Sequence, residues 1–316
     1  MSTTTTTAIT HRELGGPEVL TAGDVELAPP GDGEVTVRVQ AAGVNPIDAK
    51  LRAGIRPSGP FTEPRRVGAD AAGIVTSVGP GVEGLRVGDA VVIAFAGGTY
   101  AAEVTLDAAK VTPRPPQVSA AEGAGIGIPF ATAYQALRSL AVGSDDTLLV
   151  HGGSGAVGQA IIQFAVLWGA RVIATTSDAR ADRVRALGAE PVAYGDGLAD
   201  RVRDLAEEVT VAIDAAGTDE ALQVSLDLVA DRDRIATIVR GADADDLGIR
   251  AFSGGSPHPL TAQQLAWRTE AIPVTLALLA AGRASVEIGP HLPLDQAAEA
   301  HRLLEAGTVG KIVLVP

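Results

Sequence analysis

Three glycines form the most informative chemical motif of the sequence. Gly153, Gly155 and Gly158 have the spacing G-x-G-x-x-G; the motif follows an apolar run (148–150) and opens a second, longer one (156–168), in which Gly158 lies. A loop of this kind lets the backbone approach a pyrophosphate, and the helix that follows offers N–H donors at its N-terminus. The alternative is a plain glycine-rich turn, but the strand–loop–helix context favours dinucleotide binding. We expect this site to include Gly153, Gly155, Ala156 and Val157.

The end of the next predicted strand (171–175) distinguishes NAD from NADP. An acidic residue there would bond the ribose 2′-OH and repel a 2′-phosphate, whereas this sequence has Thr176 and Ser177. Arg180 follows and can offer charged donors to a phosphate. Against this, Asp178 could reach a ribose, and a lone arginine usually lies on a solvated helix face. The absent acid and Arg180 together favour NADPH.

The elements that must position this loop alternate between strands and helices from residue 119 onward. This alternation predicts right-handed βαβ crossovers and a parallel sheet. The predicted strands are 147–151, 171–175, 191–193, 210–214 and 234–239, and the predicted helices are 131–140, 156–168, 179–187, 198–207 and 219–229. The tail is predicted as strand, helix, strand, helix and a last strand at 311–315.

The first part of the chain has a different pattern. Short runs rich in Val, Ile and Thr (34–40, 73–78 and 90–94) are separated by Gly, Pro and Asp turns, which predicts an all-β region. The segment PRPP at residues 113–116 cannot continue a helix or a central strand and indicates a boundary. We expect the threonine-rich start, residues 1–7, to be a frayed end and not a signal peptide.

The composition excludes several kinds of site. The 316 residues contain no cysteine, which rules out disulfides, thiolate zinc sites and cysteine nucleophiles. The net charge of -13 would repel nucleic acid and anionic membranes. No apolar run of about 18 residues is present, and His151, His258, His291 and His301 show no metal-ligand spacing. We therefore expect a cytoplasmic protein with no metal, membrane or nucleic-acid site.

Four further motifs carry a family resemblance. They are AAGVNPID at residues 41–48, GADAAG at 68–73, ATAYQAL at 131–137 and GKIVL at 310–314. With them the chain resembles the zinc-independent branch of the medium-chain dehydrogenase/reductase superfamily, the quinone oxidoreductase and enone reductase group. The resemblance implies an α/β fold in which a GroES-like β domain (1–117, completed by 284–316) accompanies a doubly wound Rossmann domain (118–283).

The resemblance also assigns roles to single residues. Asn45 stands where the zinc-dependent branch has a cysteine ligand, and it would orient the ribose or the substrate; a turn-forming role before Pro46 is the alternative. Lys50 would stabilise negative charge on a carbonyl oxygen, bond the cofactor, or be an ordinary surface lysine. Thr132 would touch the nicotinamide, and Tyr194 would pack by the 2′-phosphate. Phe95, Ile128, Phe130 and Phe252 are candidates for the pocket wall or the core, and Phe252 is also counted among the cofactor-binding residues.

Two classes of function are consistent with these residues. The first is an NADPH-dependent reductase that transfers hydride to an enone or a quinone without zinc, because such acceptors are already electrophilic. The second is a non-catalytic, crystallin-like protein that keeps the NADPH site. The resemblance further implies a homodimer in which the last strand of the Rossmann sheet, predicted at 248–252, pairs with its copy.

Overall fold

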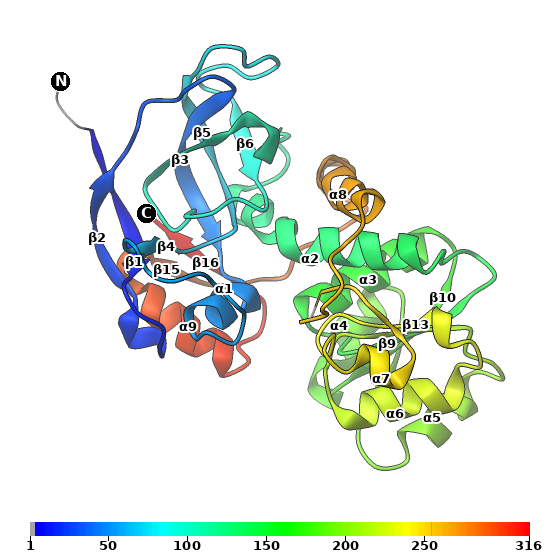
Figure 1. The fold of residues 1–316 in the computed structure, drawn as a ribbon. Coiled ribbons are helices and arrows are strands. Elements are labelled where there is room, and N and C mark those ends of the chain that lie inside the picture. Colours follow the sequence, from blue (N-terminus) through cyan, green and yellow to red (C-terminus); the bar gives the residue numbers. More distant parts are fainter. Residues whose placement is uncertain (1–3, 254) are drawn as a thin grey trace. The chain divides into compact units, whose positions relative to one another are not determined.

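The computed structural model describes residues 4–253 and 255–316 (Figure 1). The chain folds into two compact units. One, the discontinuous unit, consists of Met1–Ile128 and Ile272–Pro316, and the other, the central unit, of Pro129–Ala271. The division passes through two helices, α2 (Ala120–Ser139) and α8 (Ala262–Ala280), whereas the junctions predicted from the sequence lie just outside them.

The central unit contains a six-stranded sheet in which every pair of neighbouring strands is parallel. The spatial order is β11-β10-β9-β12-β13-β14, which becomes 3-2-1-4-5-6 when the strands are numbered along the chain, the order of dinucleotide-binding sheets. The predicted doubly wound sheet is therefore confirmed. The strands are β9 (Thr147–His151), β10 (Arg171–Thr176), β11 (Glu190–Ala193), β12 (Val211–Asp214), β13 (Ile235–Thr237) and β14 (Arg250–Ala251).

Helix α3 (Ala156–Leu167) follows β9 and anchors the core of this unit. Its side chains are almost all apolar because both the sheet and α2 cover it. Phe164 is buried, and its ring meets the rings of Phe130 and Tyr134 edge to face, at centroid distances of 5.9 Å and 5.2 Å. Phe130, a candidate for the pocket wall or the core, therefore lies in the core. The remaining helices of the unit are α4 (Ala181–Ala186), α5 (Leu198–Leu205), α6 (Asp219–Leu228) and α7 (Ala244–Leu247).

The discontinuous unit is organised around strand β3 (Glu34–Gly43). Val35, Val37 and Val39 are buried and Arg38 is exposed, the alternation expected of a pleated strand with one face in the core. The strand pairs antiparallel with β5, β7 and β16, so the end of the chain lies beside its first third. The seven strands of this sheet are β3, β5 (Asp70–Val78), β6 (Ala90–Ile93), β7 (Glu103–Asp107), β8 (Val111–Pro113), β15 (Ile288–Pro293) and β16 (Lys311–Val315).

The threonine-rich start is a strand, so the expectation of a frayed end is wrong from residue 5 onward. Strand β1 (Thr5–His11) pairs antiparallel with β2 (Thr21–Glu26) and also with β4 (Arg65–Arg66). Thr6 is buried, and its hydroxyl accepts a hydrogen bond from the Glu103 backbone N–H at 2.9 Å. β-Branched threonines suit a half-buried pleated surface. The segment forms a strand because β2 and β4 are available to pair with it. Residues 1–3 lie outside the described residues.

Two helices differ from the sequence-based expectation. Helix α2 begins at Ala120, eleven residues before the predicted start, and Ser119 and Glu122 form a capping box there: the Ser119 N–H donates to Glu122 Oε2 at 2.8 Å and the Glu122 N–H to Ser119 Oγ at 3.2 Å. This S-x-x-E signature was available in the sequence. The second helix, α1 (Pro46–Arg52), was not predicted, and proline at its first position has the φ angle that a helix requires.

Helix α9 (Ala297–Glu305) lies between β15 and β16, the last strand of the chain. Its buried face carries Ala297, Ala300 and His301. In the described part of the chain, no helix combines the length and the apolar composition needed to cross a membrane.

Candidate functional site

The glycine loop lies between β9 and α3, where the strand order of the central sheet reverses. Two hydrogen bonds fasten it to β10: the Gly152 N–H donates to Thr175 Oγ1 at 3.0 Å and the Gly153 N–H to Thr175 O at 2.9 Å. A Cβ on Gly153 would come within 2.6 Å of Ala174 Cβ, and one on Gly158 within 2.1 Å of Gly152 O. The first and third glycines of the motif are therefore required by close packing inside the protein.

Gly155, the second glycine of the motif, is different. It is exposed, and the nearest atom to an added Cβ would be Gly152 O at 3.5 Å, an ordinary contact. The protein itself thus does not require glycine here. The backbone amides of Ala156 and Val157 belong to the first turn of α3 and have no acceptor within the helix. An open glycine in front of free amides fits the approach of a pyrophosphate.

The residues predicted to discriminate NADP from NAD lie near the carboxyl ends of β10 and β11. Thr176 ends β10 and stands beside Ala193 of β11 in the parallel register, which brings Tyr194 to the same edge. Thr176 is buried, and within the described residues its hydroxyl has no hydrogen-bond partner. Ser177 is half-buried and Tyr194 is 61% exposed. Arg180 ends the 3-10 turn Asp178–Arg180 that leads into α4.

Two side chains that were not predicted, those of Gln159 and Arg183, help to hold the glycine loop in place. Gln159 Nε2 donates to the Ser154 carbonyl at 2.8 Å, and Gln159 Oε1 accepts from Arg183 Nε at 2.8 Å. Gln159 is thus held on both ends of its carboxamide. The residue lies one position after the last motif glycine, so its place in α3 was predictable but its partners were not.

A second unpredicted group lies at the carboxyl ends of β12 and β13. Asp214 is buried; its Oδ1 accepts from the Ala216 and Gly217 N–H groups at 2.9 Å and 2.7 Å, and its Oδ2 accepts from Thr237 Oγ1 at 2.8 Å. Thr237 Oγ1 in turn accepts from the Arg240 N–H at 2.9 Å. The pair shapes the two loops beside the glycine loop, since ligands of such sheets bind at the carboxyl ends of the strands.

Thr132 and Phe252 also belong to the central unit. Thr132 lies in α2, in the segment that packs on α3. Phe252 follows edge strand β14; its N–H donates to Thr237 O at 3.0 Å, its side chain is buried, and the Arg250 guanidinium lies 5.1 Å from its ring centroid. The described contacts of Phe252 are with the protein itself, and its role toward a cofactor stays a prediction.

Asn45 precedes α1 in the discontinuous unit and is completely buried. Its Nδ2 donates to Asp70 Oδ2 at 2.9 Å and to Gly43 O at 3.3 Å, while its Oδ1 accepts from the Lys311 ammonium. Burial raises the pKa of Asp70 and lowers the pKa of Lys311, and attraction between the two charges opposes both shifts. The Asn45 carboxamide is thus fully engaged within this unit.

Asp48 extends this network toward α9. Its Oδ2 accepts from the Asn45 N–H at 2.9 Å and from Tyr100 Oη at 3.0 Å, and Tyr100 Oη lies 3.4 Å from His301 Nε2. Burial raises the pKa of Asp48 to about 7, and burial lowers the pKa of His301 to about 4. Both shifts favour the neutral forms because a low-dielectric interior penalises charge.

Lys50 lies on the same short helix but in another setting. It is half-buried, and among the described residues its ammonium has no hydrogen-bond or ion-pair partner. Partial burial and the nearby Arg56 lower its pKa. A lysine with a free ammonium can donate to a bound group, whereas Lys311 is already engaged.

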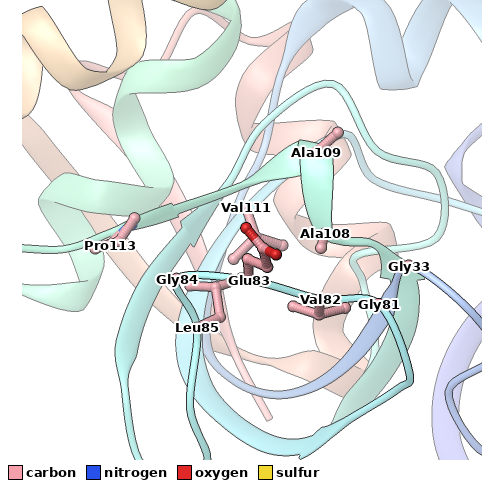
Figure 2. Close-up of a pocket in the computed structure, with 10 residues that line it drawn as sticks. All are labelled: Gly33, Gly81, Val82, Glu83, Gly84, Leu85, Ala108, Ala109, Val111 and Pro113. Carbon is pink, nitrogen blue, oxygen red and sulfur yellow. The ribbon is translucent and has the colours of Figure 1, made fainter.

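Other features of the described residues bear on metals and ligands. No group of three His, Cys, Asp or Glu side chains in the described part of the chain could hold a metal ion. A hollow of about 500 Å³ lies in the discontinuous unit, where the Glu83 carboxylate stands among Val82 and Val111 (Figure 2). None of the predicted site residues lines it, so it is separate from the candidate site.

Comparisons with known proteins agree with this geometry. Residues 31–126 match the family model of the alcohol dehydrogenase GroES-like domain, and residues 156–257 match that of the zinc-binding dehydrogenase. Quinone oxidoreductase 1 of Escherichia coli K12 is 31% identical over 331 residues, covering 98% of this chain and 99% of that protein. Pikromycin polyketide synthase component PikAII of Streptomyces venezuelae is 35% identical over 268 residues, which are 78% of this chain but only 7% of that protein.

Solved structures show the same relationship. The crystal structure of Escherichia coli quinone oxidoreductase complexed with NADPH superposes with a TM-score of 0.84 at 28% identity, covering 98% of this chain and all of that chain. The predicted pairing of a GroES-like unit with a Rossmann-like unit is therefore confirmed. Both units and the full-length match show that the chain belongs to the quinone oxidoreductase group of the medium-chain dehydrogenase/reductase superfamily.

Proposed function

We propose that this protein is an NADPH-dependent reductase that transfers hydride to an enone or a quinone without zinc. The observation that carries the proposal is the open position in front of Gly155, whose neighbouring glycines are fixed by packing. A relative that matches 98% of this chain has been crystallised with NADPH, which supports the choice of cofactor. When bound, NADPH supplies the hydride equivalent for the reduction.

The residues that would hold the cofactor are distributed along the carboxyl edge of the central sheet. The amides of Ala156 and Val157 would receive the pyrophosphate. Thr176, Ser177, Arg180 and Tyr194 would surround the 2′-phosphate, because no acidic side chain stands at the end of β10 to repel it. Thr132 and Phe252 are proposed contacts of the nicotinamide end.

Lys50 is the proposed catalytic residue. Reduction of an enone leaves negative charge on the carbonyl oxygen, and a preorganised cation stabilises that charge without reorganising during the reaction. The free ammonium of Lys50 is suited to this role. Asn45, engaged by Lys311 and Asp70, would contribute by fixing the start of α1, and direct contact of Asn45 with ribose or substrate would require these bonds to open.

The surroundings of Asn45 support independence from zinc. The only side-chain oxygen of Asn45 accepts from the Lys311 ammonium, a cation that would repel a second cation at the same place. The homodimer and the cytoplasmic location predicted from the sequence form part of the proposal. Edge strand β14 has two residues, and an antiparallel copy of it would cover the unpaired edge.

The test is turnover of NADPH with a panel of enones and quinones, followed by absorbance, in the wild type and in Lys50→Ala. We expect turnover, and a decrease of kcat with enones by a factor of about 10² to 10³ in the variant. Turnover that survives chelation supports independence from zinc.

Other outcomes identify the alternatives. An unchanged kcat with a weaker Kd for NADPH would make Lys50 a cofactor-binding residue, and no change in either would make it a surface lysine. Tight NADPH binding without turnover of any acceptor would support the non-catalytic protein.

A further inference from the structure

A second hollow in the discontinuous unit has an unusual charge. It has a volume of about 360 Å³ and ten lining residues, three of which are arginines: Arg52, Arg65 and Arg66. One lining residue, Asp48, is acidic, although acidic side chains outnumber basic ones by 38 to 25 in the whole chain. Positively charged side chains are thus concentrated around this hollow, although the protein as a whole is acidic.

Asp48 contributes little negative charge to compensate the positive charge of these arginines. Its Oδ2 is already shared by the Asn45 N–H and the Tyr100 hydroxyl, and burial raises its pKa to about 7. Near neutral pH a substantial fraction of this carboxyl group is protonated. His11, which also lines the hollow, donates its Nδ1 proton to the Glu13 carbonyl at 2.8 Å and adds no negative charge.

Two of the arginines have donors without acceptors. The Arg52 side chain is 3% exposed; its Nη2 donates to Glu305 at 2.6 Å, but within the described residues its Nε and Nη1 have no partner. The Nε of Arg66 is also buried without an acceptor. Leaving a buried guanidinium donor unsatisfied is costly, and Arg52 and Arg66, both of which line the hollow, therefore keep donors that the surrounding protein does not use.

Arg65, the third arginine, is held in place by neighbouring side chains. Arg65 Nη1 donates to Ser58 Oγ at 2.6 Å, and the Arg65 guanidinium carbon lies 3.8 Å from the ring centroid of Phe61. Phe61 meets the ring of His11 edge to face at 5.3 Å. Within the described residues no carboxylate pairs with Arg65, so this side chain is held in place while its charge remains uncompensated.

We propose that this hollow binds a small organic anion whose carboxylate or phosphate group is received by Arg66 and Arg52. The guanidinium fork matches both groups in geometry. A volume of about 360 Å³ is in the range of small-molecule pockets and too large for a single ion. Leu51 and Val67 supply apolar wall for the rest of the ligand. Binding of an anion in this hollow does not require the proposed hydride transfer to be correct.

Calorimetric titration of the full-length protein tests the site with glutarate and glycerol 3-phosphate, and with glutaramide and glycerol as neutral counterparts. We expect at least one anion to bind with a Kd in the millimolar range or tighter, and neither neutral compound to bind. Arg66→Gln is expected to weaken binding by about tenfold or more, since a charged hydrogen bond is lost. Arg86→Gln, the same change on an exposed arginine outside the hollow, is expected to bind like the wild type.

The proposal is overturned if no anion binds, if the neutral compounds bind equally well, or if Arg66→Gln binds like the wild type. Should Arg66→Gln fail to fold, Arg66→Lys replaces it, because it keeps the charge and the stem that packs on Gly98 but loses the Nε donor. A several-fold weaker Kd is then expected, and an unchanged one contradicts the site.

Competition kinetics distinguish whether the anionic group belongs to the acceptor or to a separate ligand. Helix α1 carries Lys50 as well as the lining residues Asp48 and Leu51, so the anionic group can belong to the acceptor or to a separate ligand. Competition between glutarate or glycerol phosphate and the acceptor indicates the first source, and anion binding without competition indicates the second. Both readouts are independent of whether Lys50 is catalytic.

Discussion

Asn45 and Asp70 are 25 positions apart in the sequence, yet Asn45 Nδ2 donates to Asp70 Oδ2 at 2.9 Å inside the discontinuous unit. Lys311, from the last strand, donates to the other end of the same carboxamide. Asn45 therefore links a buried carboxylate to a buried ammonium. Because all three side chains are buried, the charges compensate each other where water cannot.

Lys311→Met should strongly destabilise the protein. The variant leaves the carboxyl group of Asp70 without its cation and the Asn45 oxygen without its donor. Breaking a buried charge pair by removing one partner costs about 3–5 kcal/mol, and we expect a loss of this order in the free energy of unfolding by urea near neutral pH. The double variant Asp70→Asn with Lys311→Met should recover part of the loss, and equal stabilities of wild type and Lys311→Met would contradict the role.

Alanine at the second and third motif glycines should have opposite consequences. Gly158→Ala places a Cβ within 2.1 Å of Gly152 O, so we expect a clear loss of thermal stability. Gly155→Ala finds its nearest atom at 3.5 Å and should fold normally, but the methyl group would keep a pyrophosphate from the backbone. Thermal unfolding and NADPH titration of both variants provide the check, and a Gly155→Ala protein with unchanged Kd for NADPH would refute the assignment.

Arg180→Ala should reduce the preference for NADPH over NADH. A charge-assisted phosphate contact contributes about 1.5–3 kcal/mol, so the KM for NADPH should rise about tenfold or more while the KM for NADH changes little. The matched control is Arg185→Ala, which removes an exposed arginine of α4 that pairs with Asp182. An equal effect of the two substitutions would argue against a specific contact of Arg180.

His151 should make the protein sensitive to acid. It is buried at the end of β9, and burial lowers its pKa from 6.5 to about 4. Between these two values the unfolded chain binds more protons than the folded protein, so stability falls as the pH falls from about 6.5 to about 4. The shift corresponds to about 3 kcal/mol. Urea unfolding across this range should show a shallower acid decline for His151→Asn.

The control for this pH profile is His291→Asn, which changes an exposed histidine. Its stability should follow the wild-type decline between pH 6.5 and 4, because no buried imidazole has been removed. Parallel curves for the wild type and His151→Asn would show that the acid sensitivity originates elsewhere, for which buried His301 is the next candidate.

Local patterns in the sequence were sufficient for the parallel-sheet unit. The strand predicted at 147–151 is β9, and the helix predicted at 156–168 is α3 with one residue fewer. An apolar strand, a glycine turn and an apolar helix each leave a periodic signal within a few residues, and the steric need for glycine at Gly153 and Gly158 comes from the same segment and its neighbours. The absence of cysteine excluded thiolate sites in any fold.

Only the tertiary structure decided how distant polar residues combine. Lys311 reaches Asn45 because β16 pairs with β3, and the threonine-rich start becomes β1 because β2 and β4 flank it. Arg52 and Arg66 reach one hollow through α1 and β4, which residues 53–64 separate in the sequence. Strand register between distant segments depends on the packing of whole sheets and leaves no mark in a short window of sequence, whereas the burial that shifts the pKa of Asp48 and His301 exists only after those sheets have formed.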